Sequence, residues 1–313
     1  MPELSHRQGK LILVPYAERL GANSGVNISN DKNRQDIYLK NCCVSACSAK
    51  QYNSDCDVAI ATNIDLPERY VQILAQNDIA VIKIPFDLFK FDNTYLWSLA
   101  FYKLCVLYHM AHEGKYQYYA YMDTDVYVQS SFDNIWVECD HNILLYDINH
   151  GLQVNDYRIF LDEVNDFLGQ RQLLTHYGGE FFAANYEMAL LFSEKCLSVY
   201  HEILRRNFVT TKGDEFILSL VAAEIKNNIK NAGAYIYRFW TGTFRLVSTN
   251  YDHNAVNILH VPAEKERGML RLYDRYISKG KKISSSKVHG ILHLRHPVLK
   301  YWVMTQLRKI RAK

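Results

Sequence analysis

The sequence lacks the signals that send a chain out of the cell or into a bilayer. Its first ten residues, MPELSHRQGK, hold no apolar stretch followed by a cleavage site, so we expect no signal peptide. No apolar run reaches the roughly 18 residues that a membrane-spanning helix needs. A Gly-x-x-x-x-Gly-Lys loop is also missing, which argues against a P-loop nucleotide site. The first two absences favour a cytoplasmic protein.

Paired cysteines are missing as well. The seven cysteines are an odd number, and Cys42, Cys43, Cys47 and Cys56 form no Cys-x-x-Cys pair. Zinc sites commonly show such pairs, and disulfide frameworks use an even number of cysteines. We therefore expect reduced thiols, as in a cytosolic protein.

The composition that remains is that of an ordinary folded protein. Of 313 residues, 49% are apolar and 22% are charged, which allows one large α/β domain or a domain with an appendage. Tyrosine is abundant, with 23 copies. Its flat ring with a polar edge suits contacts with sugars, bases and interfaces.

Charge is distributed unevenly along the chain. Residues 275–313 contain eleven Lys and Arg and no Asp or Glu, and removing these eleven from the net charge of +3 leaves −8 for residues 1–274. Such asymmetry indicates an anionic partner, either a membrane or a nucleic acid. Residues 296–311 mix aromatic, aliphatic and cationic side chains, which is typical of a helix in a membrane interface. The alternative is a C-terminal helix packed on its own domain.

Apolar strands alternate with amphipathic helices along the first half of the chain. We predict strands over residues 10–16, 57–62 and 79–84 and a strand entering residue 122, with helices over 34–49, 66–77 and 96–108. This alternation predicts a mostly parallel sheet covered by helices on both faces. Later segments predict strands at 142–146, 234–240 and 257–260, a further strand after the glycine pair at 178–179, and helices at 186–206 and 216–226.

Two carboxylates mark the end of the central strand. Asp123 and Asp125 stand one residue apart after a run of tyrosines. Burying an unpaired carboxylate is costly, so a partner is expected, and hard oxygen ligands suit a divalent cation that carries a phosphate. Asp-x-Asp triplets are also common turn residues. The position beyond the carboxyl end of a parallel strand, where such sheets bind ligands, favours the metal.

Four other features contain candidate residues, and each has a structural alternative. Lys103 lies on an apolar helix face and either snorkels to the helix edge or meets a phosphate. The Gly178–Gly179 pair permits close approach of a ligand or another backbone. Asp214 and Glu215 open a helix, where acidic residues also favour the macrodipole. His260 ends the last strand and could be a satisfied core histidine.

The order of these parts resembles nucleotide-sugar-dependent glycosyltransferases of the GT-A fold, most closely the retaining family 8. The resemblance is carried by the helix with Lys103, by residues 121–128 (YMDTDVYV) with 132–136 (FDNIW), and by His260 with Lys265 five residues later. Residues 177–184, with Asp214-Glu215 downstream, are similar to the retaining family 6. Two departures leave the subfamily and the stereochemical outcome open, since family 8 usually has Gln at the place of Glu215 and Gly where Pro262-Ala263 follow the histidine.

The resemblance implies a GT-A (Rossmann-like) α/β fold, with a mixed, mostly parallel sheet in a catalytic domain of residues 1–270. From charge and composition we expect a basic, partly amphipathic helical extension over residues 271–313. It implies Mn²⁺ or Mg²⁺ as cofactor and a UDP-sugar as donor. The implied metal ligands are Asp123, Asp125 and His260, and the implied donor contacts are Lys103, Asp123 and Lys265 for the diphosphate and Tyr16 for uridine.

The resemblance also places an Asp-Glu pair beside the anomeric carbon. Asp214 and Glu215 are the first candidates, as stabiliser of the cation-like transition state or as nucleophile. Glu180 is the second candidate. If the enzyme inverts, one of the three would be the general base.

We therefore expect a metal-dependent hexosyltransferase of surface polysaccharide or glycoconjugate synthesis. It would transfer sugar, with retention, from a UDP-sugar to a glycan or lipid-linked acceptor, and its tail would contact the membrane peripherally. The alternatives are an inverting GT-A transferase and a metal-dependent nucleotidyl or phosphoryl transferase. A nucleic-acid-binding protein acting through the tail would leave Asp123, Asp125 and His260 without a purpose, so no nucleic-acid partner is expected.

Overall fold

A seven-stranded sheet forms the centre of the molecule. The structure, a computed structural model, describes residues 7–21, 28, 34–93, 95–148, 155–241, 255–281, 284–294, 303 and 307. In this part of the chain the strand order is β3-β2-β1-β4-β7-β6-β8. The strands are β1 (Lys10–Tyr16), β2 (Asp57–Thr62), β3 (Ala80–Lys83), β4 (Tyr118–Met122), β6 (Ile143–Asp147), β7 (Tyr177–Asn185) and β8 (Ile229–Asn231). Only β7 runs antiparallel to its neighbours, so the mostly parallel α/β sheet is confirmed.

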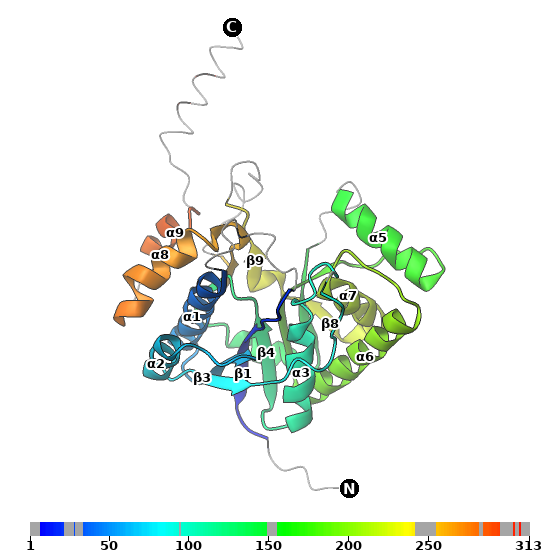
Figure 1. The fold of residues 1–313 in the computed structure, drawn as a ribbon, viewed down its shortest axis with the longest axis horizontal. Coiled ribbons are helices and arrows are strands. Elements are labelled where there is room, and N and C mark those ends of the chain that lie inside the picture. The colour runs from blue at the N-terminus through cyan, green and yellow to red at the C-terminus, as the bar shows by residue number, and fades with distance from the viewer. Residues whose placement is uncertain are drawn as a thin grey trace.

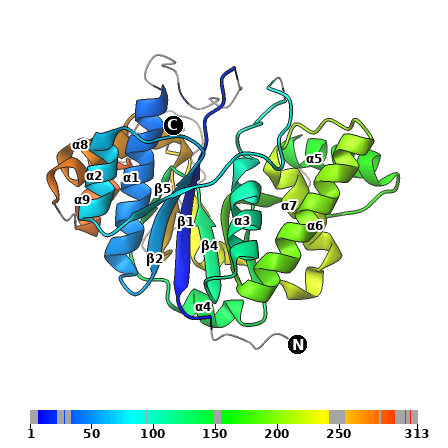
Figure 2. The ribbon, with the colours of Figure 1, turned by 60° about the horizontal axis from the view of Figure 1, so that its bottom comes forward.

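Helices cover both faces of this sheet (Figure 1). Figure 2 shows α1, α2, α8 and α9 on one side and α3, α6 and α7 on the other. The helices are α1 (Arg34–Tyr52), α2 (Glu68–Gln76), α3 (Tyr102–Glu113), α4 (Asn134–Cys139), α5 (Asn155–Leu168), α6 (Tyr186–Arg205), α7 (Asp214–Glu224), α8 (Gly268–Arg275) and α9 (Ser285–Ile291).

The large sheet has one hydrophobic core on each face, because side chains alternate between the faces along each strand. In β4, Ala120 and Met122 belong to the core on the α1 side, and Tyr119 and Tyr121 to the core on the α3 side. Successive side chains of a strand point to opposite faces. A strand buried on both faces therefore needs an unbroken apolar run, as the sequence of β4 has.

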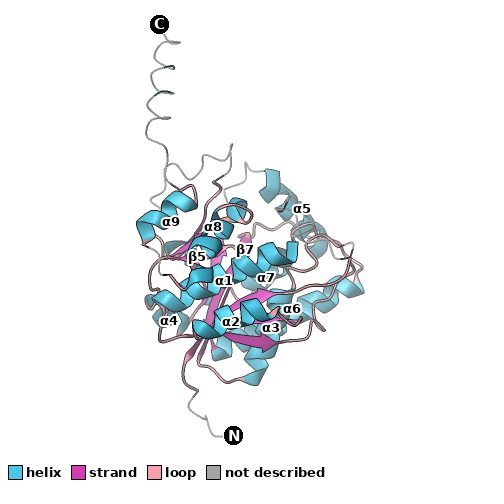
Figure 3. Ribbon diagram, turned by 60° about the vertical axis from the view of Figure 1, so that its left-hand side comes forward, coloured by secondary structure: helices cyan, strands magenta, loops and turns pink. Residues whose placement is uncertain are grey.

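A second, smaller sheet begins just after the two aspartates. It has the order β5-β10-β9, with β5 (Val126–Val128) antiparallel to β10 (Ile258–His260) and β10 parallel to β9 (Ile236–Arg238). β5 packs beside α1 (Figure 3). The chain therefore leaves the large sheet after Met122 and enters the small one at Val126. Asp123 and Asp125 lie in the crossing between the two sheets.

The helix predicted from residue 96 begins later, at Tyr102. Trp97 has a φ of 61°, in the left-handed region that a regular right-handed helix cannot include. Residues 95–101 form turns instead, and the apolar side chains of Phe101 and Tyr102 still reach the core.

The described part of the predicted C-terminal extension packs on the body of the protein. α8 begins at Gly268, so the predicted boundary after residue 270 falls inside a helix. Val288 and Leu292 are fully buried, and His289 Nε2 lies 2.6 Å from Gln129 Oε1. Of the predicted interfacial segment 296–311, all but residues 303 and 307 lie outside the described residues. No described helix has the length and apolar character needed to cross a bilayer.

Candidate metal and catalytic site

The register of the large sheet places Asp123 opposite Glu180. β4 and β7 pair Met122 with Phe181, and the Asp123 N–H donates to the Glu180 carbonyl at 3.0 Å. Both residues lie beyond the carboxyl end of β4. This is the edge at which parallel sheets bind their ligands.

The small sheet brings three further residues to the same edge. His260, the last residue of β10, pairs with Val126 of β5 on one side and with Arg238 of β9 on the other. The Val261 N–H donates to the Asp125 carbonyl at 3.0 Å. Backbone pairing alone therefore sets His260 between Asp125 and Arg238.

Asp123, Asp125 and His260 form a group that could hold a metal ion. Their ligand atoms all lie within 4.8 Å of one another, with His260 Nε2 3.3 Å from Asp125 Oδ2 and 3.9 Å from Asp123 Oδ2. Two carboxylates and one imidazole suit Mn²⁺ or Mg²⁺, and the imidazole shifts the preference towards Mn²⁺.

Asp125 provides the test of whether a cation fits. It is 1% exposed, and its Oδ2 accepts no hydrogen bond of acceptable geometry from the described residues, although Lys265 Nζ lies 3.1 Å and His260 Nε2 lies 3.3 Å away. A buried polar atom without a hydrogen bond is rare, and a bound ion is one explanation for it. The residues of the cluster therefore fit the expected divalent cation.

Charges in the cluster hold one another in the ionised form. Burial favours the neutral form of each group, but Lys265 and His260 outweigh this effect and hold the pKa of Asp125 well below its usual value. Burial would likewise lower the pKa of His260, but Asp125 and Glu180 outweigh it and raise that pKa to about 9. A proton on the imidazole therefore competes with a metal ion.

Glu180 connects His260 to a half-buried arginine, Arg238. Its carboxylate is 0% exposed, accepts two hydrogen bonds of 2.7 Å from Arg238, and lies 3.1 Å from His260 Nδ1. Arg238 also lies 3.1 Å from Glu215 Oε1. Glu215 Oε2 in turn lies 3.0 Å from His176 Nε2, whose ring stacks on Phe160. These contacts run continuously from His260 through Glu180, Arg238 and Glu215 to His176.

Lys103 bridges Asp123, of the candidate metal site, and Asp214. Its Nζ lies 3.0 Å from Asp123 Oδ1 and 3.0 Å from Asp214 Oδ2. Burial would lower the pKa of Lys103, but the two carboxylates outweigh it and keep that pKa well above its usual value. Burial raises the pKa of Asp214 to about 7. The contacts of Lys103 in this structure are thus with carboxylates, while its predicted phosphate contact stays a prediction.

The glycine pair of β7 makes room for these side chains. A Cβ at Gly178 would overlap with Glu180 Oε2, and one at Gly179 would overlap with Asp214 Oδ2 and lie 2.8 Å from Lys103 Nζ. Close approach was expected from a ligand or another backbone. The atoms that approach here belong to charged side chains of the site.

Tyr16 lies at the end of β1 with a second tyrosine nearby. Its ring centroid is 6.1 Å from that of Tyr38, and its hydroxyl donates to Glu18. Lys265 Nζ lies 5.7 Å from the centroid of the Tyr38 ring. The residue expected to meet uridine and the lysine expected to meet the diphosphate are thus linked through one aromatic side chain.

Sequence reasoning missed Arg238, His176 and Tyr38. The sequence held a signal for Arg238, which is a lone cation at the end of the short apolar strand β9. His176 directly precedes the strand with the glycine pair. Tyr38 shares a helical face with no other candidate and could not have been selected from its spacing.

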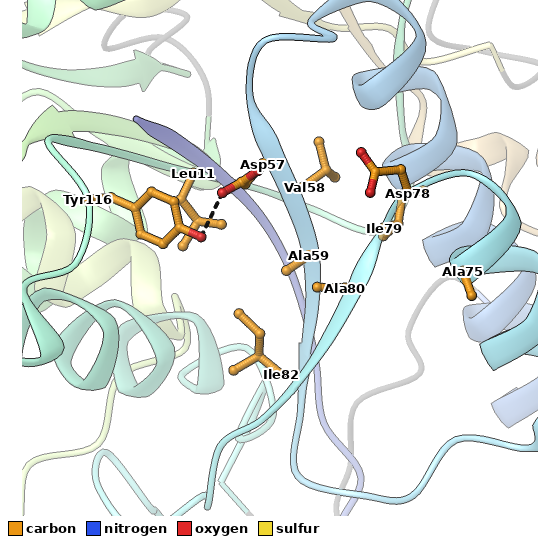
Figure 4. A pocket seen from close by; sticks show the side chains of 10 residues that line it. All are labelled: Leu11, Asp57, Val58, Ala59, Ala75, Asp78, Ile79, Ala80, Ile82 and Tyr116. Carbon is orange, nitrogen blue, oxygen red and sulfur yellow. Dashed lines mark hydrogen bonds between the residues drawn. The ribbon is translucent and has the colours of Figure 1, made fainter. Parts of the chain in front are cut away.

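Two other features lie away from this site. A pocket of about 350 Å³ opens at the amino ends of β1, β2 and β3, where Tyr116 donates to Asp57 at 2.8 Å (Figure 4). It is at the opposite end of the sheet from Asp123. Asp87, Cys105 and His109 form a second close group, but burial raises the pKa of the Cys105 thiol to about 12, and this thiol donates to the Pro85 carbonyl. We assign neither feature a role.

No protein-family model matches this chain, and no curated protein matches it significantly. Its function is therefore inferred from the residues themselves.

Proposed function

We propose that this protein is a metal-dependent glycosyltransferase of the GT-A fold that moves a hexose from a UDP-sugar to a glycan or lipid-linked acceptor, with retention. The observation that carries the proposal is the convergence of Asp123, Asp125 and His260 on one point beyond the carboxyl end of β4. The motif order that resembles family 8 implies the same three ligands. Burying so many charges costs stability, which is understandable if their purpose is chemical.

The candidate metal site would stabilise the departing nucleotide. A divalent cation bound there would act as a Lewis acid on the diphosphate, where negative charge develops. Lys265, 3.1 Å from Asp125 Oδ2, would add a second cation to the same place. Tyr16 and Tyr38 would offer aromatic surface for the uracil ring.

Glu215 is the best candidate for the carboxylate beside the anomeric carbon. Burial would raise its pKa, but His176 and Arg238 outweigh this and lower it to about 2, so Glu215 is ionised at neutral pH. Its side chain is 22% exposed, whereas that of Asp214 is 5% exposed and that of Glu180 is fully buried. An ionised, accessible carboxylate suits a nucleophile or a stabiliser of positive charge, and this favours retention.

An inverting reaction would instead need a general base with a pKa near the working pH. Asp214 has such a pKa, about 7. Its low exposure and its contact with Lys103 leave it little access to an acceptor hydroxyl. We therefore rank Glu215 above Asp214, and both above Glu180.

The acceptor and the location rest on charge. The eleven cations between residue 275 and the end, unopposed by any acidic residue, suit a cytoplasmic enzyme that works beside an anionic membrane surface. A lipid-linked acceptor in surface polysaccharide synthesis fits that location.

The test is release of UDP from a panel of UDP-sugars with and without Mn²⁺. Asp125→Asn removes one ligand with little change in shape. Asp87→Asn is a matched control, because Asp87 also pairs with a histidine, with 2.8 Å between its Oδ1 and His109 Nε2, but lies outside the site. We expect Mn²⁺-dependent release by the wild type and by Asp87→Asn, and its loss in Asp125→Asn.

Release that ignores both Mn²⁺ and Asp125→Asn would refute the site. Because hydrolysis of the donor without acceptor is slow in many transferases, binding of UDP is measured in parallel by calorimetry. Absence of Mn²⁺-dependent UDP binding would overturn the proposal.

A further inference from the structure

The two ring nitrogens of His260 face different partners. Nδ1 lies 3.1 Å from Glu180 Oε1, and Nε2 lies 3.3 Å from Asp125 Oδ2. An ionised carboxylate can only accept hydrogen bonds, so Nδ1 carries a proton that it donates to Glu180. Nε2 is then the atom that faces the two aspartates. Metal-binding histidines commonly have such a carboxylate behind them, which fixes the ring and its tautomer.

Glu180 is itself held firmly. Arg238 donates to both of its carboxylate oxygens at 2.7 Å, and its carbonyl accepts from the Asp123 N–H. The Glu180 carboxylate occupies the space beside Gly178, where a Cβ would overlap with Glu180 Oε2. Glu180 lies in β7 of the large sheet and Arg238 lies in β9 of the small sheet, so the geometry of this ion pair is fixed by two sheets at once.

We propose that Glu180 is a positioning residue that orients His260 towards the metal, and that Arg238 fixes Glu180 while holding Glu215. One guanidinium thus connects the metal end of the site with the carboxylate that we place at the sugar end. Glu180 was expected from sequence as a second candidate for direct catalysis. Its full burial and its two partners favour this indirect role instead.

The inference rests on the proposed metal site, and the test separates the two. Mn²⁺ binding to the full chain is measured by calorimetry in the absence of nucleotide, for the wild type and for Glu180→Gln, Glu180→Asp, Asp125→Asn and the control Asp87→Asn. Removing a group behind a metal ligand typically weakens metal binding about 10- to 100-fold. We expect that loss in Glu180→Gln, a smaller loss in Glu180→Asp, and wild-type binding in Asp87→Asn.

A second variant guards against simple destabilisation. Glu180→Gln leaves the half-buried Arg238 with one charged partner fewer, whereas Glu180→Gln combined with Arg238→Gln removes both charges of the pair. If Glu180 were only half of a structural ion pair, the double variant would recover both thermal stability and Mn²⁺ affinity. We expect it to recover stability and to keep the weak Mn²⁺ affinity.

Pulsed EPR of bound Mn²⁺ detects the histidine ligand directly, independently of any change in the stability of the protein. Coupling to a histidine nitrogen should be present in the wild type, absent in His260→Asn and diminished in Glu180→Gln. Wild-type affinity and nitrogen coupling in Glu180→Gln would overturn this inference and leave the proposed function intact. Failure of the wild type to bind Mn²⁺, or binding indifferent to Asp125→Asn, would overturn both.

Discussion

At the scale of single residues, burial disfavours the charged form of the Asp214 carboxyl group. Burial raises its pKa from an ordinary value of 3.8 to about 7, with Glu215 and Asp123 adding to the shift and Lys103 opposing it. A carboxyl whose folded-state pKa is raised favours the protonated form in the folded protein. It therefore contributes stability that is fully present below the unfolded pKa and is lost as the pH rises through about 7.

This shift predicts a pH-dependent difference between the wild type and Asp214→Asn. As the pH rises from 5 to 8, the wild type should lose free energy of unfolding relative to the variant, by roughly 1 to 3 kcal/mol, since each unit of pKa shift corresponds to about 1.4 kcal/mol. Urea unfolding of both proteins in EDTA, at several pH values, measures the difference. A constant difference across this range would show that Asp214 does not titrate there.

Sequence alone could indicate the proposed metal ligands but not their partners. Asp123 and Asp125 stand out because carboxylates interrupt a buried strand, and His260 because a strand ends on it. Arg238 meets Glu180 only because β9 pairs with β10 in a register that sets Arg238 beside His260. That pairing joins segments with no local pattern in common, so no spacing in the sequence reveals it.

At the scale of the elements, packing against the charged side chains of the site restricts the sequence of β7. Its two glycines stand where Glu180, Arg238, Asp214 and Lys103 pack against the backbone. Glycine weakens a strand interior, so its use here marks space that the charged side chains need.

We predict that Gly179→Ala lowers the free energy of unfolding by about 1 to 3 kcal/mol, as overpacking typically does. The new Cβ would overlap with Asp214 Oδ2 and force the Lys103–Asp214 contact apart. The control is Gly290→Ala in α9, where a Cβ meets nothing within 4 Å and alanine favours the helix. Chemical denaturation compares the two, and equal stabilities would contradict the packing seen in β7.

Most elements could be predicted, and the exceptions have physical reasons. β1 and β2 match their predicted bounds because continuous apolar runs define them. α5 was missed although Tyr157, Phe160, Leu161 and Val164 are buried at helical spacing, a signal that was present. β5 could not be separated from β4, because its partner β10 lies more than 100 residues along the chain.

At the scale of the whole molecule, the site joins two sheets and the charge divides into an acidic body and a basic end. The helix of that end within the described residues, α9, packs on α8, and α8 packs on α1. Residues 295–313 carry six of the eleven cations. Membrane attraction by this end can therefore be tested without removing the helices that complete the core.

We predict that the full chain binds vesicles containing phosphatidylserine and that a chain ending at residue 294 binds them much more weakly. Each Lys or Arg near an anionic surface contributes about 1 kcal/mol, and this attraction falls as salt screens it. Cosedimentation with anionic and with neutral vesicles, at low and high salt, measures the effect. Unfolding of both chains is the control, because Leu292 and the rest of α9 are kept. Equal binding by the two chains would place the membrane contact elsewhere, and binding that ignores lipid charge would remove the electrostatic basis for a membrane-bound acceptor.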